Sequence, residues 1–218
     1  RIVPPEQRSV KLAEMYGLGP QAAPDDAIRT QGEIRTHLLK AGKPAFVTES
    51  FLSFAETYEL IVELGAIPCY PTLADGTDPI CEYEHPPEKL IENLRSRNVH
   101  MAEYIPIRNT PEVLERYVRA VRGAGIAVVA GTEHNTLDLL ALEPACVGGA
   151  PVPAGLKDIF LEGACIVAAH EFLVLHGECG FVDPHGDPNG EYDGAEERIA
   201  AFAALGAAVI QRYHDMSA

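Results

Sequence analysis

Three polar residues that could do acid–base or metal chemistry, Glu133, His134 and Asn135, come soon after an apolar run at residues 126–130. That run, IAVVA, predicts a buried strand, because it holds only apolar residues and follows two glycines that end a helical pattern. In parallel βα structures, ligands bind in the loops after the carboxyl ends of strands. An acid, an imidazole and an amide at such a place suit a metal ion, a phosphate group or proton transfer. Glu133 and His134 could equally cap the next helix or pair with a neighbouring loop, so both interpretations stay open on spacing alone.

Two other predicted strands also end in polar residues. Residues 67–70 form one short strand, and residues 100–105 form the next. Because the carboxyl ends of parallel strands meet at one edge of a sheet, their polar residues are candidates for substrate contacts or for supporting roles around a site. These candidates are Thr72 and Asp75 after the first strand, Glu103 and Asn109 on and after the second, and Asn135 after the third.

Helices are predicted between these strands. Ser53 and Glu56 form a capping box before a helix that stops at Gly65. Residues 87–97 are helical, and Thr110 with Pro111 begins a further helix that runs to residue 122. Residues 6–42 are helical with breaks, and residues 42–47 are predicted to be extended. Three strands separated by helices indicate an α/β fold with a parallel sheet or barrel and right-handed crossovers.

The character of the chain changes after Asn135. A Pro/Gly-rich linker at 144–155 leads to a long helix at 156–176, a Gly/Asp/Pro-rich loop and a final helix, opened by a capping box of Asp193 and Glu196. The long helix is apolar around more than one face, so we expect it to be buried between the barrel and the final helix or in a homodimer interface. The predicted domains are therefore an α/β domain at 1–143 and a helical extension at 144–218.

Two other histidine-containing patterns are weaker. His170 and Glu171 begin a zincin-like HExxH pattern, but position 174 is Val, so the second metal ligand is missing and His170 is predicted to be a hydrogen-bonded core histidine. The loop that follows carries His176, Cys179 and Asp183 among Gly and Pro residues, and it is predicted to be a solvated turn.

Charge and cysteine content exclude several classes of protein. The formal net charge of −15 and the lack of a Lys/Arg cluster exclude nucleic acid as a main partner. No apolar run approaches the length of a membrane span, and no secretory signal is found. Five cysteines, an odd number without a CxxC pair, are typical of a reduced cytoplasmic protein. The chain starts at Arg1 without a Met, which is compatible with its being part of a longer protein.

Four segments in register resemble the PHP (polymerase and histidinol phosphatase) superfamily. Residues 35–47 contain GKPAFV, which resembles the family's GKPAYV-like segment, and residues 65–73 resemble its GGVPVLAHP-like strand. Residues 101–112 are similar to a GIEVYYPSHSPE-like segment, and residues 131–135, GTEHN, are similar to a GSDFH-like metal motif. The resemblance covers about residues 30–136. It implies a PHP-like distorted βα barrel, TIM-like and partial or divergent here, followed by the helical extension.

The resemblance also implies a cluster of divalent metals, such as Mn, Zn, Fe or Mg, which activates water on phosphoesters. Glu133 falls where the family has a ligand Asp, and His134 is one residue out of register with the ligand His, so these two are the expected metal ligands. Thr72 and Asn135 stand where the family has histidines. The amino-terminal HxH motif has no counterpart, because the matching region would lie before Arg1. Either a preceding segment carries it, or the site is degenerate.

Two functions follow from this pattern. The first is a metal-dependent phosphoester hydrolase that acts on a small, phosphorylated molecule. The second is a non-catalytic PHP-like protein whose altered pocket binds a ligand or partner. Asp75, Glu103 and Glu133 favour retained affinity for a cation, whereas Thr72 and Asn135 favour the second function.

Overall fold

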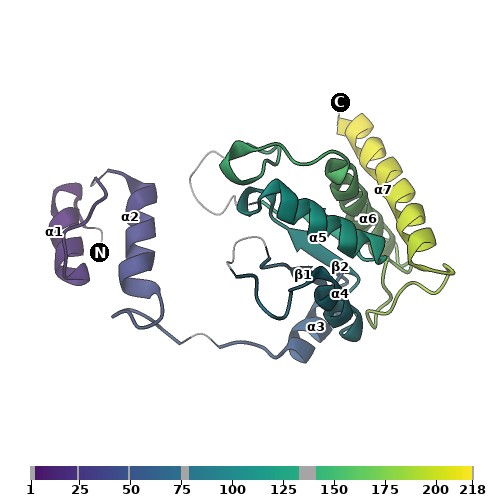
Figure 1. Ribbon diagram of the computed structural model, residues 1–218, viewed down its shortest axis with the longest axis horizontal. Helices are drawn as coiled ribbons and strands as arrows, with labels where there is room; N and C mark the ends of the chain where they lie inside the picture. Colours follow the sequence, from purple (N-terminus) through teal and green to yellow (C-terminus); the bar gives the residue numbers. More distant parts are fainter. Residues whose placement is uncertain (1–2, 24, 49, 75–78, 133–140, 218) are drawn as a thin grey trace. The chain divides into compact units, whose positions relative to one another are not determined.

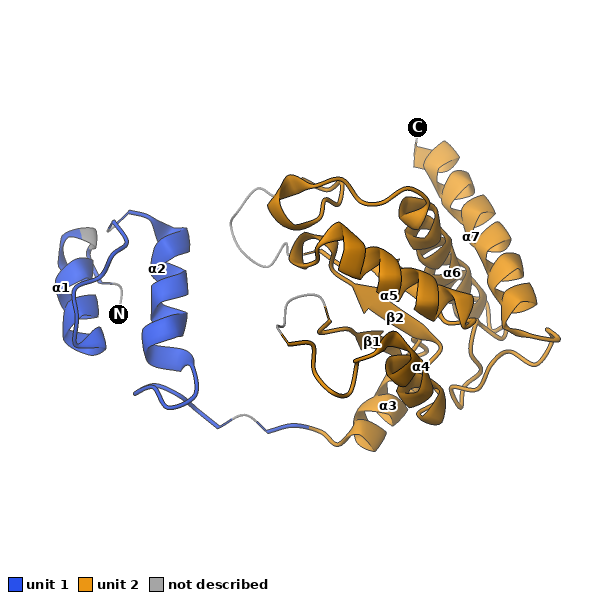
Figure 2. Ribbon diagram, viewed as in Figure 1, with its two compact units in different colours: residues 1–51, 134–140 blue, residues 52–133, 141–218 orange. Residues whose placement is uncertain are grey.

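The computed structural model describes residues 3–23, 25–48, 50–74, 79–132 and 141–217, and the chain falls into two compact units. Unit 1 comprises residues 1–51 and 134–140, and unit 2 comprises residues 52–133 and 141–218 (Figure 2). The predicted domain boundary at residue 143 stays a prediction.

Unit 1 is helical in its described part. It contains α1 (Pro5–Tyr16), α2 (Ala27–Ile34) and a wider π-helical turn, η1 (Arg35–Leu39), that continues α2. The turn between α1 and α2 is held by Glu33, whose Oε1 accepts hydrogen bonds from the backbone N–H groups of Gln21 and Ala22 at 2.7 and 2.8 Å. The extended segment predicted at residues 42–47 is wrong, because residues 42–45 form turns and a bend and the segment contains no strand.

Unit 2 is an α/β structure around three short parallel strands (Figure 1). Its elements in chain order are α3 (Phe54–Glu63), β1 (Cys69–Pro71), α4 (Pro87–Ser96), β2 (Met101–Tyr104), η2 (Pro106–Arg108), α5 (Pro111–Gly123), β3 (Ala127–Ala130), η3 (Val147–Gly149), α6 (Leu156–Leu175) and α7 (Ala195–Ser217). Strand β2 lies between β1 and β3. The prediction of one parallel sheet built from these strands is confirmed, as are the capping box of Ser53 and Glu56 and the Thr110 cap of α5.

The sheet is open in the described part of the chain. Its three strands do not close into a ring, so the PHP-like, TIM-like barrel is not present there and stays an expectation of the resemblance. The first strand also begins later than the predicted residue 67, at Cys69. Proline at position 68 has no N–H group to donate to a neighbouring strand.

The strand residues alternate between two cores. Ala102 and Val128 face one core, which α4 and α5 fill with Leu90, Leu114 and Val118. Met101 and Ala127 face the opposite way, into the second core, where the apolar side chains are Ile166 and Ala169 of α6, Ile199 and Phe202 of α7, and Phe181 and Val182 of the loop between these helices.

The long helix α6 packs on β3 and on α7. Gly163 of α6 faces the backbone of Val128, and a methyl group at this position would overlap the Val128 carbonyl oxygen. A methyl group at Gly206 of α7 would likewise overlap the Cys165 carbonyl oxygen of α6. The prediction that the long helix lies against the final helix on one side is therefore confirmed, and on another side it packs on the open sheet. Among the described residues, no helix combines the length and the apolarity that crossing a bilayer requires.

Candidate functional site

The carboxyl ends of the three strands lie at one edge of the sheet. Pro71 of β1 is level with Glu103 of β2, and Tyr104 of β2 is level with Ala130 of β3. Polar residues that end one strand therefore neighbour those that end the next. This edge brings together Thr72, Glu103 and the start of the loop that follows β3.

The Glu103 carboxylate occupies the space that Gly131 leaves open. A Cβ atom at position 131 would overlap Glu103 Oε1, so only glycine lets the carboxylate lie there. The side chain is half-buried and has no hydrogen bond or ion pair to another described residue. Its negative charge and burial raise the pKa of the neighbouring Cys69 thiol to about 12, with burial the larger cause. Glu103 is thus a charged oxygen donor at the sheet edge, beside a thiol that stays protonated at neutral pH.

Thr72 is buried, and its polar groups bond to the backbone of β2. Its hydroxyl donates a hydrogen bond to the carbonyl oxygen of Glu103 at 2.8 Å, and its N–H group donates to the same oxygen at 3.1 Å. These two bonds extend the pairing of β1 with β2 by one residue. The Thr72 hydroxyl therefore fixes the backbone of Glu103 through its carbonyl oxygen.

Asn109 is also buried, at the end of η2. Its Nδ2 donates to the Ile105 carbonyl at 3.0 Å, and its own carbonyl accepts from the N–H of Val147 at 2.9 Å. The Asn109 Oδ1 atom has no hydrogen-bond partner in the described part of the chain. Asn109 therefore ties the segment after β2 to the segment around η3, and its placement is that of a structural residue with one spare acceptor.

Glu84, which the sequence analysis did not single out, is the most buried carboxylate near this edge. It is fully buried, and it accepts hydrogen bonds from the Tyr70 hydroxyl at 2.9 Å and from the Leu73 N–H at 2.8 and 3.0 Å. Burial, and next the hydrogen bond to Glu84, raise the pKa of Tyr70. These bonds fix where the loop after β1 begins. No local pattern separates Glu84 from Glu82 two residues earlier, so the sequence held no signal for it.

Four predicted site residues lie outside the described residues: Asp75, Glu133, His134 and Asn135. The two expected metal ligands, Glu133 and His134, stay predictions. Within the described ranges, no group of three His, Cys, Asp or Glu side chains could hold a metal ion. A carboxylate is the kind of ligand that hard divalent cations prefer. Of the two described carboxylates near the edge, Glu84 already accepts hydrogen bonds from Tyr70 and Leu73, so Glu103 is the better candidate ligand.

His170 is a core histidine, as predicted. Its Nε2 lies 3.0 Å from the Gly65 carbonyl, and its Nδ1 accepts a hydrogen bond from the Phe181 N–H at 2.9 Å. This pairing requires the neutral ring with the proton on Nε2, and burial accordingly lowers the pKa of His170. The loop after α6 is a turn, as predicted, in which Asp183 accepts from the backbone of His185 and Asp187. The final helix differs in one detail, because Asp193 N–H donates to Glu197 and not to the predicted Glu196.

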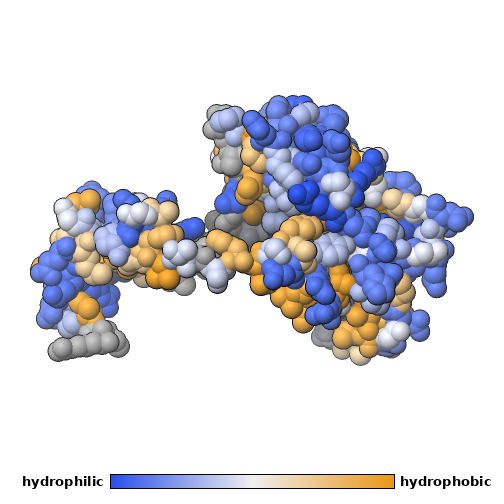
Figure 3. All heavy atoms as spheres, turned by 90° about the horizontal axis from the view of Figure 1, so that it is seen from below, coloured by the Kyte–Doolittle hydropathy of each residue, from blue (hydrophilic) through white to orange (hydrophobic). Residues whose placement is uncertain are grey.

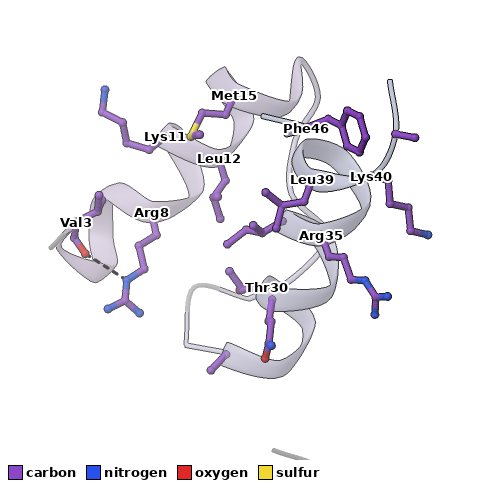
Figure 4. Close-up of a pocket in the computed structure, with 14 residues that line it drawn as sticks. Val3, Arg8, Lys11, Leu12, Met15, Thr30, Arg35, Leu39, Lys40 and Phe46 are labelled. Atoms are coloured by element: carbon purple, nitrogen blue, oxygen red, sulfur yellow. Dashed lines mark hydrogen bonds between the residues drawn. The ribbon is translucent and has the colours of Figure 1, made fainter. Parts of the chain in front are cut away.

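Unit 1 contains a cavity of about 960 Å³ between α1 and residues 27–46 (Figure 4). Leu12 and Leu39 point into it from opposite sides, whereas Lys11 and Lys40 point away. Exposed apolar side chains also gather on unit 2, as Figure 3 shows in orange. The exposed apolar side chains of unit 2 include Phe54 and Leu60 of α3 and Leu64, which directly follows this helix.

None of these apolar surfaces carries a set of catalytic side chains, so the carboxyl edge of the sheet remains the candidate site. Comparison with known proteins adds no family to this description: no family model matches the chain, and no curated protein or solved structure matches it.

Proposed function

We propose that this chain carries the later part of a PHP-like, metal-dependent hydrolase that acts on phosphoesters of small molecules. The parallel sheet with its polar carboxyl edge agrees with the resemblance over residues 30–136. The Glu103 carboxylate is the observation that carries the proposal, because a half-buried charge without a described partner is costly unless a cation offsets it.

The proposed ligand among the described residues is Glu103, and Glu133 and His134 stay the ligands that the resemblance implies. Gly131, which makes room for the Glu103 carboxylate, precedes Glu133 by two residues in the chain. A divalent metal ion at this edge would polarise phosphoryl oxygens and lower the pKa of bound water. Thr72 positions Glu103 through its backbone carbonyl, and Glu84 with Tyr70 holds the start of the loop after β1.

The alternative is a non-catalytic PHP-like protein that binds a ligand or partner, and one observation favours it. Thr72 stands where the family has a ligand histidine, and its hydroxyl proton is engaged by the Glu103 carbonyl at 2.8 Å. A hydroxyl that is engaged in this way is a much weaker ligand for a cation than an imidazole. A site with fewer ligands would bind a metal ion without supporting turnover.

Metal analysis combined with a phosphatase assay distinguishes these functions. The purified 218-residue chain is dialysed against Mn²⁺ or Zn²⁺, its retained metal is measured, and hydrolysis of p-nitrophenyl phosphate is followed. Glu103→Gln keeps the volume and removes the charge, and it should weaken metal retention about tenfold or more. Glu59→Gln, at an exposed position on α3, is the matched control.

Metal retention and turnover that are both lost in Glu103→Gln, and kept in Glu59→Gln, support the hydrolase. Metal retention without turnover supports the non-catalytic alternative. Equal metal content in wild type and Glu103→Gln contradicts the proposed role of Glu103.

A further inference from the structure

A second cavity, of about 300 Å³, lies at the opposite edge of the sheet, where the strands begin. It is lined by His100 and Ile126, which directly precede β2 and β3, and by Arg198 near the start of α7. The segment that joins α6 to α7 passes this end of the sheet (Figure 1) and contributes Asn189 and Tyr192 to the lining. The cavity has the size of a small-molecule site and is separate from the carboxyl edge.

Arg198 is a buried cation that forms no ion pair with any described residue. Its side chain is 3% exposed, and its Nε and Nη1 atoms have no hydrogen-bond partner among the described residues. The guanidinium carbon lies 4.4 Å from the centre of the Phe181 ring, which stabilises the charge only in part. An unpaired buried charge is destabilising, so an anion is the natural partner of this group.

The lining of the cavity is suited to an anion. Arg95 and Arg198 line it, and no Asp or Glu does, although the chain has 32 acidic and only 17 basic residues. Four carboxylates stand nearby. Asp193, Glu196 and Glu197 line a neighbouring groove, where Glu196 pairs with Arg122 at 2.7 Å. Asp187 accepts a hydrogen bond from Asn98 at 2.8 Å. The Asp187 carboxylate is therefore already engaged outside the cavity.

The start of α7 adds donors. Gly194 and Ala195 line the cavity. The backbone N–H of Arg198 donates a hydrogen bond to the Gly194 carbonyl at 3.1 Å, which begins the hydrogen bonding of the helix. The N–H groups of the first helical turn have no carbonyl within the helix to donate to, and the helix dipole places partial positive charge at this end. The first residues of α7 and Arg198 therefore line one small space.

We propose that this cavity binds the oxyanion group, phosphate or carboxylate, of a small molecule. Arg198 donates Nε–H and Nη–H groups to two oxygens, and the amino-terminal turn of α7 donates backbone N–H groups. The planar fork of the guanidinium pairs equally well with a phosphate group and with a carboxylate group. The experiment below distinguishes which of the two groups the cavity binds. This site is independent of the proposed hydrolase activity, because it lies at the other edge of the sheet.

Two probes test the proposal on the full chain at constant ionic strength: inorganic phosphate and malonate. Each is titrated in a thermal unfolding assay and by calorimetry. An anion that binds only the folded chain raises the midpoint of unfolding in proportion to the logarithm of its concentration. Stabilisation by phosphate alone identifies a phosphate site, and stabilisation by malonate alone identifies a carboxylate site. If neither anion binds to wild type, the proposal is overturned.

Three variants assign the binding to the cavity. Arg198→Met should abolish the stabilisation, and Arg198→Lys, which keeps the charge but loses the fork, should weaken anion affinity about tenfold. Arg212→Met removes an exposed arginine from the same helix and should leave affinity unchanged. If Arg198→Met does not fold, the Lys variant and the wild-type titrations decide. Anion affinity that is the same in Arg198→Lys, or in a folded Arg198→Met, as in wild type overturns the assignment, since the anion then binds elsewhere.

Discussion

Tyr70 of β1 donates its hydroxyl to the buried carboxylate of Glu84 across 2.9 Å. The two residues are 14 positions apart, and the bond joins the end of the first strand to the segment before α4. The same carboxylate accepts the Leu73 N–H, so one buried group holds the start of the loop after β1.

Tyr70→Phe should destabilise the chain by about 1–3 kcal/mol. The substitution removes one donor from a buried carboxylate and leaves that charge less well satisfied, which is the costly way to lose a hydrogen bond. Urea unfolding followed by circular dichroism measures the change. Tyr213→Phe on the exposed end of α7 is the control and should be near neutral. A Tyr70→Phe variant as stable as the control would show that this bond adds nothing to stability.

Gly131→Ala should destabilise unit 2 by about 1–3 kcal/mol, because its methyl group would overlap the Glu103 carboxylate. The effect should shrink strongly when Glu103 is shortened to Ala, since the overlapping atoms are then gone. A double-mutant cycle of Gly131→Ala and Glu103→Ala measures this coupling by urea unfolding. Strictly additive free energies would mean that the two residues do not share the space at the sheet edge.

Gly163→Ala should be among the most damaging single methyl additions, costing about 3 kcal/mol or more. The new methyl group would meet the rigid backbone of β3 at Val128, which cannot move aside as a flexible side chain can. Gly123→Ala, at the end of α5 with nothing within 4 Å, is the matched control and should be neutral or stabilise by up to about 1 kcal/mol. Thermal unfolding midpoints of the two variants give the comparison, and similar midpoints would contradict the close packing of α6 on the sheet.

His100 should make the protein less stable as the pH falls. Burial, and next the positive charge of Arg198, lower its pKa from 6.5 to about 4. Its Nε2 lies 2.8 Å from Asn98 Oδ1, and because Asn98 Nδ2 donates elsewhere, the His100 ring must donate here. Between pH 6.5 and 4 the unfolded chain binds a proton that the folded chain does not, so stability falls with pH across that window and is unaffected at pH 7 and above.

His100→Gln should flatten this dependence. The amide has no proton to gain, so the midpoint of thermal unfolding in phosphate-free buffers should decrease less between pH 6.5 and 4 than in wild type. The lowered pKa of His170 acts in the same direction and remains in the variant, so the slope is reduced and not removed. Identical slopes for the two proteins would show that His100 titrates normally in the folded state.

Local patterns predicted most elements of unit 2. The strands at β2 and β3 and the caps at Ser53 and Thr110 follow from apolar runs and from short-range hydrogen bonds, which depend on neighbours in the chain. The prediction of an extended segment at residues 42–47 was wrong, because an apolar pair after a Pro does not distinguish a strand from a turn.

The buried charged residues were harder to predict from the sequence than the strands and the helix caps. Glu84 and Arg198 are ordinary charged residues in sequence, and their importance comes from burial, which depends on packing between distant segments. His170 could be predicted as a core residue because it stands in an apolar helix, whereas the hydrogen bond from Phe181 joins it to a loop. The open sheet also shows that alternating strands and helices predict pairing but not closure.

The packing of α6 also determines the order in which backbone amides exchange with solvent. Since α6 packs on β3 and on α7, its central amide protons can reach deuterium only after one of these neighbours has detached. Residues 210–217 of α7 are exposed, and their amides can exchange through fraying of the helix end alone. Isotope exchange should therefore mark a slow centre that contains a helix as well as the three short strands, with the final two turns of the chain exchanging first.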